Sequence, residues 1–344
     1  MTDPLRLSVL DLAPIGAGHT ASDALRHSTQ LVQVVERLGY HRHWVAEHHN
    51  MPGIASSAPA VLLAHLGSVT DRIRLGSGGV MLPNHSPLVI AEQFGMLEAL
   101  HPGRIDLGIG RAPGTDPRTA HALRRPIGAL QEPDLPQLLG ELLGFFNGSF
   151  PESHPYHPIT AVPGRGHQPA LWLLGSSDYS ARLAGALGLP FSFAHHFSAA
   201  NTVPAVAIYR ESFRPSAVLT EPYVMLGVAA LAAADEAEAR RLSKPGDLAF
   251  LRLRAGRPGP FPTPEEAADF HPTPHEKDLI ASWSTSRIVG DAEQVEGSLR
   301  ALVARTAADE LMITTMVHDP RDRIRSYELI AAQVGVEPLV IPAH

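Results

Sequence analysis

The chain has 344 residues, of which 44% are hydrophobic and 18% charged, so a disordered chain and a highly charged coiled coil are both excluded. Its 28 lysines and arginines against 35 aspartates and glutamates give a net charge of -7, which leaves no basic domain for nucleic acid or an anionic membrane surface. The sequence has no cysteine, which removes disulfides, thiolate zinc sites and cysteine nucleophiles together.

Short apolar runs followed by longer amphipathic runs recur along the chain, and this rhythm predicts repeated βα units. The predicted strands are residues 5–10, 43–46, 73–82, 105–109, 171–174, 191–194, 223–230 and 311–314. The predicted helices are residues 22–38, 59–69, 87–100, about 123–146, 177–187, 203–213 and 235–242, then one that begins after Asp291 and one over about 321–334. Strands alternating in this way without a clean midpoint break favour a closed (β/α)8 TIM barrel over a doubly wound sheet.

Residues typical of helix starts support several of these boundaries. Ser22 is the expected N-cap of the first helix. Ser86 and Pro87 are typical of a cap followed by a first helical turn. Asp291 and Gln294 have the spacing of a capping box.

Two proline-rich stretches interrupt the rhythm, at about residues 147–169 and 249–285. We expect both to be insertions in a single domain that spans residues 1–344, and the second is a candidate lid. The first six residues lack the layout of a signal peptide, and no apolar run approaches the roughly 20 residues that span a bilayer. A cytoplasmic location is therefore expected, with no membrane partner.

Ligands of an α/β barrel bind where strands end and loops begin, so the residues after each predicted strand are the candidates. The second strand is followed by Glu47, His48 and His49, which could form an acid–base group, a metal-ligand pair or polar packing. Because adjacent strand residues point to opposite faces, at most one of the two histidines is expected to share a pocket with Glu47 if the strand continues through them. With His195 and His196 as further ligand candidates, a metal-dependent hydrolase stays open.

Gly78 and Gly79 lie inside the third predicted strand, where glycine weakens the strand because it adds backbone freedom and buries nothing. A flat ligand that rests on bare backbone would explain the pair. A β-bulge or a tight barrel corner is the alternative.

The fifth strand ends in Gly175, Ser176 and Ser177, and Ser180 follows one helical turn later. Free N–H groups, hydroxyls and the positive end of a helix dipole suit a phosphate, although Ser177 could merely cap its own helix. Arg111, at the end of the fourth strand, would supply a permanent positive charge, although a lone arginine is more often a solvated surface group.

Several of these segments together resemble the bacterial luciferase-like family of flavin-dependent monooxygenases. The resemblance rests on the order and spacing of residues 45–49 (VAEHH), 75–83 (LGSGGVMLP), 87–93 (PLVIAEQ), 102–111 (PGRIDLGIGR), 173–177 (LLGSS), 188–190 (GLP), 288–291 (IVGD) and 308–312 (ADELM). It covers nearly the whole chain and is strongest toward uncharacterised single-component members rather than the light-emitting subunits.

The resemblance implies a TIM barrel that binds reduced FMN, usually delivered by a separate NAD(P)H-dependent flavin reductase. The positions that match the FMN-phosphate site of the family are Arg111, Gly175, Ser176, Ser177 and Ser180. Gly78 and Gly79 would lie under the isoalloxazine, where relatives carry a cis non-proline peptide. His48 would be the acid–base group near the flavin and substrate, with Glu47 its neighbour below the ring.

The implied reaction is oxygenation of a small organic substrate by reduced FMN and O2 through a C4a-hydroperoxyflavin, in an enzyme that is often a homodimer and needs no metal. The reactive cysteine of luciferase is Gly110 here, and light emission is not expected. The two insertions leave the substrate open. The alternatives are a dehydrogenase that depends on the deazaflavin F420, a metal-dependent TIM-barrel hydrolase and a non-catalytic flavin-binding protein.

Overall fold

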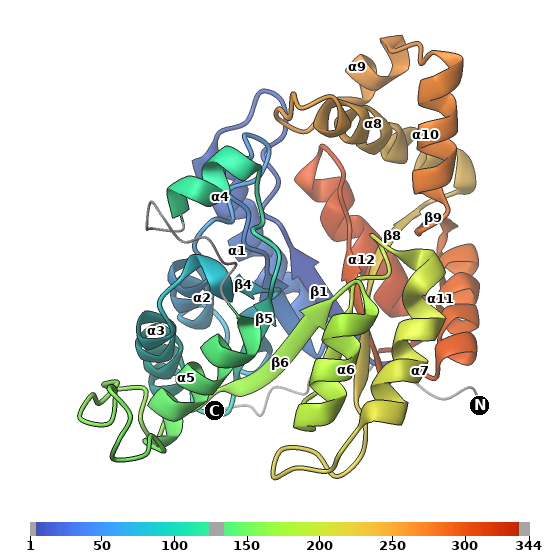
Figure 1. Ribbon diagram of the computed structural model, residues 1–344. Coiled ribbons are helices and arrows are strands. Elements are labelled where there is room, and N and C mark those ends of the chain that lie inside the picture. The colour runs from blue at the N-terminus through green and yellow to red at the C-terminus, as the bar shows by residue number, and fades with distance from the viewer. Residues whose placement is uncertain (1–4, 124–133, 337–344) are drawn as a thin grey trace, which may run out of the picture.

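Strand β1 (Leu7–Asp11) pairs in parallel with β2 (Arg42–Val45) on one side and with β10 (Glu310–Thr314) on the other. Because β10 also pairs with β8 (Val224–Ala233), the sheet closes on itself. The predicted (β/α)8 TIM barrel is therefore confirmed (Figure 1).

This computed structural model describes residues 5–123 and 134–336 of the chain. Within them, the other strands of the ring are β3 (Arg74–Ser77), β4 (Val80–Met81), β5 (Ile105–Gly110), β6 (Ala170–Gly175) and β7 (Phe191–Phe193). Strands β3 and β4 share one place in the ring, because both pair with β5 and only Gly78 and Gly79 separate them. The predicted strand over 73–82 is therefore two shorter strands.

The sequence rhythm does not predict β9 (Arg287–Asp291), which lies beside the ring rather than in it. Strand β8 is longer than the predicted strand over 223–230, and its last five residues, Ala229–Ala233, pair with β9. These residues read Ala-Ala-Leu-Ala-Ala, and alanine has a low strand propensity. The pairing with β9, rather than local preference, keeps this end of β8 extended.

Helices cover the outside of the ring, and most of them follow directly after a strand (Figure 1). In chain order they are α1 (Ala21–Arg37), α2 (Pro59–Gly67), α3 (Pro87–Leu100), α4 (Pro117–Leu123), α5 (Leu135–Asn147), α6 (Asp178–Leu187), α7 (Thr202–Ser212), α8 (Glu236–Arg254), α9 (Pro264–Asp269), α10 (Pro274–Ser284), α11 (Ala292–Thr306) and α12 (Pro320–Val334), with short 3-10 turns η1 (Leu82–Asn84) and η2 (Ala199–Asn201). The predicted helix over about 123–146 overlaps α5, and its residues 124–133 lie outside the described part of the chain.

The predicted start of α1 is wrong by two residues. Thr20, not Ser22, is the N-cap: its hydroxyl accepts a hydrogen bond from the Asp23 N–H, and the Asp23 carboxylate accepts one from the Thr20 N–H. This reciprocal pair satisfies two N–H groups at once, which a cap at Ser22 would leave without partners. The capping box predicted for Asp291 and Gln294 is confirmed at the start of α11.

Helix α8 does not end at Leu242 as predicted but continues to Arg254, through Pro245. Buried positions continue across the proline, because Pro245 is itself buried and Leu242, Pro245, Leu248 and Leu251 follow one another at steps of three residues. The stretch over 249–285 therefore contains the last turns of α8 as well as α9 and α10.

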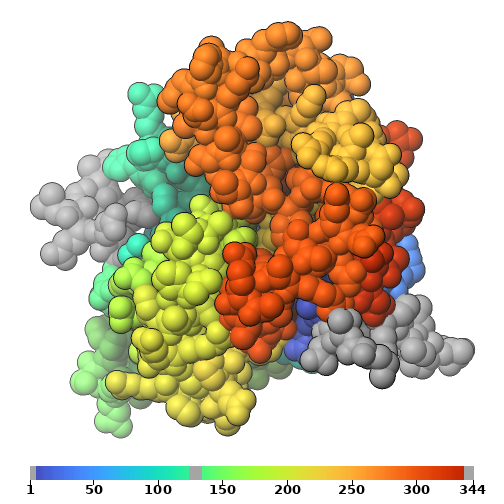
Figure 2. Space-filling view, turned by 90° about the vertical axis from the view of Figure 1, so that its right-hand side faces the viewer, coloured from blue at the N-terminus to red at the C-terminus, as the bar shows by residue number. Residues whose placement is uncertain are grey.

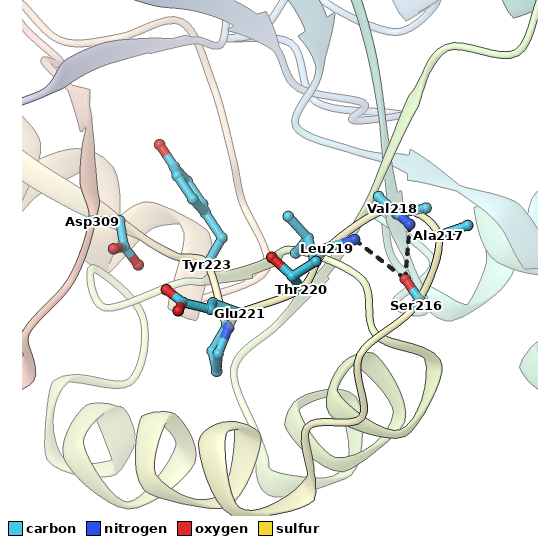
Figure 3. Close-up of a pocket in the computed structure, with 9 residues that line it drawn as sticks. Ser216, Ala217, Val218, Leu219, Thr220, Glu221, Tyr223 and Asp309 are labelled. Carbon is cyan, nitrogen blue, oxygen red and sulfur yellow. Dashed lines mark hydrogen bonds between the residues drawn. The ribbon is translucent and has the colours of Figure 1, made fainter.

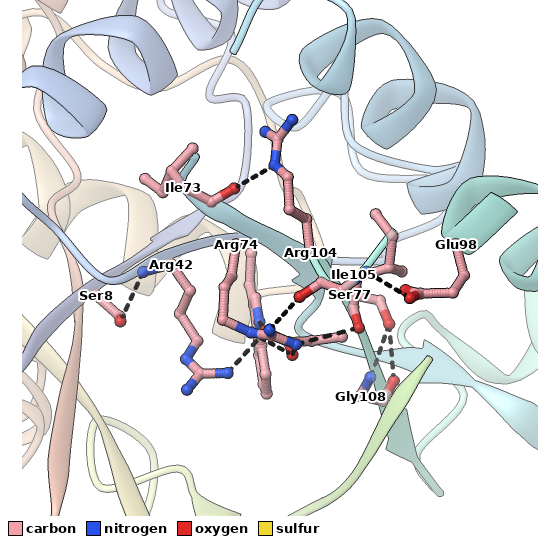
Figure 4. Close-up of polar contacts among 12 residues, drawn as sticks. Ser8, Arg42, Ile73, Arg74, Ser77, Glu98, Arg104, Ile105 and Gly108 are labelled. Carbon is pink, nitrogen blue, oxygen red and sulfur yellow. Dashed lines mark hydrogen bonds and ion pairs between the residues drawn. The ribbon is translucent and has the colours of Figure 1, made fainter. Parts of the chain in front are cut away.

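A buried network of ion pairs lies inside the ring at the N-terminal ends of the strands. The Arg42 guanidinium donates to Asp106 and to Glu310, each at 2.7 Å. Trp44 Nε1 also donates to Asp106, at 2.9 Å. Figure 4 shows Arg42 and Arg74 converging on this region. The loss of one partner would leave a buried charge unpaired, which is strongly destabilising. The network therefore holds the N-terminal ends of these strands together.

The C-terminal ends of the strands point toward the upper part of Figure 1, where α4 and α8 to α10 lie. In Figure 2 the segment that contains α9 and α10, in orange, forms the top of the molecule. None of the described helices is long and apolar enough to cross a membrane.

Candidate functional site

A cavity of about 420 Å³, which we call the barrel cavity, opens at the C-terminal ends of the strands. The predicted site residues that line it are His48, Gly78, Arg111, Gly175, Ser176, Ser177 and Ser180. Glu47 and Gly79 are not among its lining residues. Residues from several strand ends thus meet at one place, where TIM barrels bind their ligands.

The first turn of α6 contributes hydrogen-bond donors to the barrel cavity. Ser177 occupies the N-cap position with an extended backbone, yet its side chain makes no capping hydrogen bond. The structure therefore does not use Ser177 to satisfy its own helix, and the first N–H groups of α6 are left for a ligand. Ser180, one turn later, packs against Gly175, where an added Cβ would lie 2.4 Å from the Ser180 Cβ.

Arg111 follows β5 and brings a positive charge to the same end of the cavity. Its guanidinium carbon lies 4.6 Å from the centroid of the Tyr179 ring, which belongs to the first turn of α6. Within residues 5–123 and 134–336, Arg111 forms no ion pair. The charge is thus held beside the uncapped helix end and is free to bind an anion.

Bare backbone forms the wall of the barrel cavity between β3 and β4. Gly78 and Gly79 are joined by a cis peptide bond. A Cβ added at Gly78 would lie 2.6 Å from Leu10 Cδ1, and one added at Gly79 would lie 2.8 Å from the Gly108 carbonyl oxygen. A side chain at Gly79 would therefore force the backbone of Gly108 to move, whereas one at Gly78 would require the end of the Leu10 side chain to shift.

Glu47 is fully buried, and several groups share its carboxylate. His49 Nε2 and His85 Nε2 each lie 2.9 Å from Oε1, and the Met81 N–H donates to Oε2 at 3.1 Å. Burial raises the pKa of Glu47, but the hydrogen bonds from His85, His49 and Met81 outweigh it and hold that pKa below its usual range. Glu47 therefore stays charged at neutral pH and ties the end of β2 to the residues after β4.

His48 lines the barrel cavity, whereas its neighbour His49 contacts Glu47, so only one of the two histidines meets that carboxylate. Strand alternation is not the cause, because β2 ends at Val45, before these residues. His48 Nδ1 is buried and makes no hydrogen bond within the described chain. Burial lowers the pKa of His48, the Glu47 carboxylate raises it, and the net shift is downward. The imidazole is therefore neutral near pH 7.

A second cavity of about 420 Å³, which we call the side chamber, adjoins the barrel cavity. The residues that line both are Leu12, His48, Phe197, Ala229, Trp283, Arg287, Thr314 and Met316. Sequence reasoning identified only His48 among them. Thr314 could have been found, because it is the last residue of a predicted strand and such positions hold ligands in TIM barrels. Trp283 lies on α10, which the rhythm of the sequence does not predict.

The histidine pair after β7 is occupied by local contacts. His195 Nδ1 lies 2.8 Å from Thr202 Oγ1, and His196 Nδ1 lies 2.8 Å from the Gly227 carbonyl oxygen. Burial lowers the pKa of His196 to about 4. In the parts of the chain that the structure describes, no three His, Asp or Glu side chains gather in a way that could hold a metal ion. The described residues therefore offer no set of metal ligands of the kind that a metal-dependent hydrolase would need.

A further cavity of about 360 Å³ lies around residues 216–223 and Asp309, at the N-terminal ends of β8 and β10 (Figure 3). Ser216 Oγ accepts hydrogen bonds from the N–H groups of Val218 and Leu219 at 3.0 and 3.3 Å. These hydrogen bonds within residues 216–219 stabilise the turn. Because it lies at the opposite end of the barrel, it is separate from the predicted site.

The fold and the barrel cavity define a TIM barrel whose ligand site lies at the C-terminal ends of its strands. The family model of luciferase-like monooxygenases matches residues 5–310. The chain therefore belongs to the luciferase-like monooxygenase family, as its motifs indicate.

Relatives of similar length support this assignment. A luciferase-like monooxygenase of Escherichia coli (strain K12) is 46% identical over 330 residues, which cover 96% of this chain and 97% of that one. The N-acetyl-S-alkylcysteine monooxygenase of Bacillus subtilis (strain 168) is 36% identical over 337 residues, 96% of this chain and 98% of that one. The crystal structure of apo-MsnO8 matches with a TM-score of 0.87 at 36% identity, covering 97% of this chain and 100% of that one. The class is that of an oxidoreductase of the monooxygenase type.

More distant solved structures share the fold alone. The oxygenating constituent of 3,6-diketocamphane monooxygenase from Pseudomonas putida, solved in complex with FMN, has a TM-score of 0.70 at 19% identity and covers 98% of this chain and 100% of that one. The coenzyme F420 dependent tetrahydromethanopterin reductase from Methanopyrus kandleri has a TM-score of 0.68 at 17% identity, and the match covers 96% of this chain and 98% of that one. Barrels of this shape thus serve both flavin and deazaflavin enzymes.

Proposed function

We propose that this protein is a monooxygenase that uses reduced FMN and O2 to oxygenate a small organic substrate. One observation carries the proposal: the barrel cavity joins Arg111, which forms no ion pair with the described residues, and the uncapped end of α6 to a wall of bare backbone at Gly78. The arginine and the helix end suit a phosphate dianion, and the bare backbone suits a planar ring. FMN carries both groups in one molecule.

The side chains at the phosphate end support this fit. Ser176, Ser177 and Ser180 line the cavity, and their hydroxyls make no hydrogen bonds within the described residues. A phosphate accepts several hydrogen bonds, so it would pair these hydroxyls together with the first N–H groups of α6. The residues present therefore fit the phosphate of FMN.

Reduced FMN, when bound, supplies the electrons with which O2 is activated toward the substrate. The protein then has to hold the ring and exclude water, and the ion-pair network at Arg42 closes the barrel beneath the cavity. His48 is the proposed acid–base group, because its neutral imidazole lines the cavity and can accept or donate a proton near neutral pH.

We assign Glu47 a positioning role in the same site. Its carboxylate is buried away from the cavity and binds His49, His85 and the Met81 N–H. These contacts hold the end of β2, and with it the backbone of His48, against the segment after β4. Glu47 thus acts on the chemistry through the position and the charge environment of His48.

We further propose a homodimer that receives reduced FMN from a separate NAD(P)H-dependent flavin reductase. The dimer is supported by exposed apolar side chains on α3, where Val89, Met96 and Leu100 are 43%, 52% and 61% exposed. Their spacing of seven and four residues places them on one face of the helix. Val61 of α2 is 72% exposed as well, and a second copy of the chain would remove these side chains from water.

The test is an anaerobic titration of the purified protein with reduced FMN, reduced riboflavin and reduced F420. We expect FMN to bind at least about tenfold more tightly than riboflavin, because only FMN carries the phosphate. Turnover with a flavin reductase, NADH and isotopically labelled O2, over a screen of aldehydes, ketones, sulfonates and amines, should place one labelled oxygen atom in the product. Preference for F420 with hydride transfer in the absence of O2 would refute the proposal.

A further inference from the structure

Two buried polar groups without partners lie at the boundary between the barrel cavity and the side chamber. Thr314 is 6% exposed, and its Oγ1 makes no hydrogen bond within residues 5–123 and 134–336. His48 Nδ1 is also buried without a hydrogen-bond partner among these residues. Thr314 and His48 each line the barrel cavity and the side chamber. Because buried polar groups are almost always paired in native proteins, two unpaired groups on one cavity wall indicate a ligand that pairs them.

The register of β10 turns Thr314 toward the cavities. Met312, two residues earlier, lines the barrel cavity, and Glu310 belongs to the ion-pair network inside the ring. Alternate residues of a strand share a face, so Thr314 lies on the inner face with them. Leu311 and Ile313 belong to the apolar core between the ring and the helices.

Beyond this boundary, the side chamber has apolar and aromatic walls. Its side chains from the loops, α8, α10 and β9 include Leu12, Ile54, Phe250, Leu253, Phe261, Trp283, Ile288 and Val289. The rings of Phe250 and Trp283 are stacked, with centroids 4.6 Å apart and planes 3° from parallel. A chamber of this kind favours an apolar group, because such a group is more stable there than in water.

Among the described residues that line the side chamber, Arg287 alone carries a permanent charge, and that charge is already paired. Arg287 Nη1 donates to Asp247 at 2.6 Å, and Nη2 donates to the Ser243 carbonyl oxygen at 3.0 Å. The guanidinium also lies over the Trp283 ring, 4.4 Å from its centroid. An anionic substrate would have to displace Asp247 or remain unpaired among apolar side chains, and both are unfavourable.

We propose that the substrate is an uncharged, largely apolar molecule with one hydrogen-bond acceptor, such as a carbonyl oxygen, which the Thr314 hydroxyl binds beside His48. The apolar remainder of the molecule lies in the side chamber. Thr314 is then a positioning residue that sets which substrate atom faces the barrel cavity. The inference rests on the proposed function, because it makes the side chamber the substrate site beside the cofactor.

The experiment is equilibrium binding of octan-2-one and octanoate to the full-length protein without flavin, in excess inorganic phosphate so that octanoate does not bind at Arg111, measured by isothermal titration calorimetry. We expect octan-2-one to bind at least about tenfold more tightly than octanoate, because only the ketone avoids burying a charge. Thr314→Val keeps the shape of the side chain and should weaken octan-2-one binding about tenfold, whereas Thr314→Ser keeps the hydroxyl and should stay within about threefold of wild type.

A second pair of variants tests where the ketone binds. Ala249 of α8 lines the side chamber and not the barrel cavity, so Ala249→Trp should abolish octan-2-one binding and leave the affinity for FMN unchanged. Ala237→Trp, at an exposed position of the same helix, is the matched control and should change neither. Circular dichroism confirms that each variant is folded.

Three results would overturn the inference: no binding of octan-2-one, octanoate binding as tightly as the ketone, or equal ketone affinity of Thr314→Val and wild type. Binding of FMN is measured separately on the same samples. If FMN fails to bind while the ketone pattern holds, the proposed cofactor is wrong and the ligand assignment of the side chamber stands.

Discussion

The guanidinium carbon of Arg111 lies 4.6 Å from the centroid of the Tyr179 ring. This contact holds the end of β5 against the first turn of α6, two places that are far apart in the sequence. The positive charge and the uncapped helix end therefore converge on one end of the barrel cavity. The contribution of Arg111 and that of the helix end to the proposed phosphate site can each be tested by a separate substitution.

Arg111→Ala should weaken FMN binding by about 10- to 100-fold, because a hydrogen bond to a charged group contributes about 1.5–3 kcal/mol. Binding of riboflavin, which has no phosphate, should stay unchanged, as should FMN binding to Arg118→Ala, an exposed arginine on α4. Flavin fluorescence quenching measures all of these affinities. An equal loss for riboflavin would contradict the assignment of Arg111 to the phosphate.

Ser177→Asp should separate the stability of α6 from ligand binding. Aspartate is a favoured N-cap that complements the helix dipole, so the melting temperature should stay the same or rise. The new carboxylate should nevertheless repel the phosphate and lower FMN affinity by at least about tenfold. Ser177→Asn, an uncharged cap, is the control and should lose less affinity. Unchanged FMN binding to the aspartate variant would show that the phosphate lies elsewhere.

His48→Ala should leave FMN binding largely intact and slow oxygenation by about 100- to 10,000-fold, the usual contribution of an acid–base group. His121→Ala, an exposed histidine on α4, should retain wild-type turnover. Turnover of the true substrate at saturating reduced FMN measures the effect. Wild-type turnover by His48→Ala would rule out the acid–base role.

The pH profile provides a second readout of the His48 role. Burial lowers the pKa of His48 from its ordinary value of 6.5, so the neutral imidazole persists into more acidic solution and the acid limb of kcat/KM, which reports the free enzyme, should lie below pH 6.5. The Glu47 carboxylate raises that pKa, so Glu47→Gln should move the limb to still lower pH. A shift toward higher pH would contradict this coupling.

Arg323→Met should destabilise the barrel by about 3–5 kcal/mol at pH 7, because it removes the buried positive charge that pairs with the Asp11 carboxylate. Arg323, on α12, donates to Asp11, the last residue of β1, at 2.8 Å, and both residues are buried. The double variant with Asp11→Asn removes both charges and should recover part of the loss. Urea unfolding measures the three free energies.

The same pair predicts an acid dependence of stability. Burial raises the pKa of Asp11, but the Arg323 guanidinium and His43 outweigh it and hold that pKa well below its usual range. The pair therefore stabilises the fold above pH 3.8, the ordinary pKa of the group, and this contribution declines as the pH falls further. The difference between wild type and Arg323→Met should shrink over that range, and a constant difference would argue against the ion pair.

Met96→Glu should convert a dimer into a monomer, because it places a charge in the centre of the exposed apolar face of α3. We expect wild type to show twice the chain mass of 36.9 kDa by light scattering, and the variant to show a single chain mass. Leu187→Glu, on α6 and 39% exposed, is the control and should remain dimeric. A wild-type protein of single chain mass would refute the dimer.

Local sequence signals predicted the elements that depend on near neighbours. The barrel strands and the capping box at Asp291 were predictable because alternation, spacing and cap chemistry act over a few residues. Strand β9 and the long α8 were not, because the extended end of β8 and the continuation past Pro245 depend on what packs against them. Thr314 was missed for a related reason: its hydroxyl matters only because none of the groups that the structure describes pairs with it.

By itself, the sequence determined the barrel, the family and the glycines and serines at the strand ends, because these follow from periodicity and from the order of short motifs. Only the tertiary structure decided that Glu47 anchors its neighbours rather than lining the cavity, that Ser177 leaves its helix uncapped, and that Arg287 is paired with Asp247. The contacts of Glu47 with His85 and of Arg287 with Asp247 join segments distant in the chain, and such contacts form only in the folded barrel, whereas the missing cap at Ser177 is a side-chain geometry that the residue type alone does not fix.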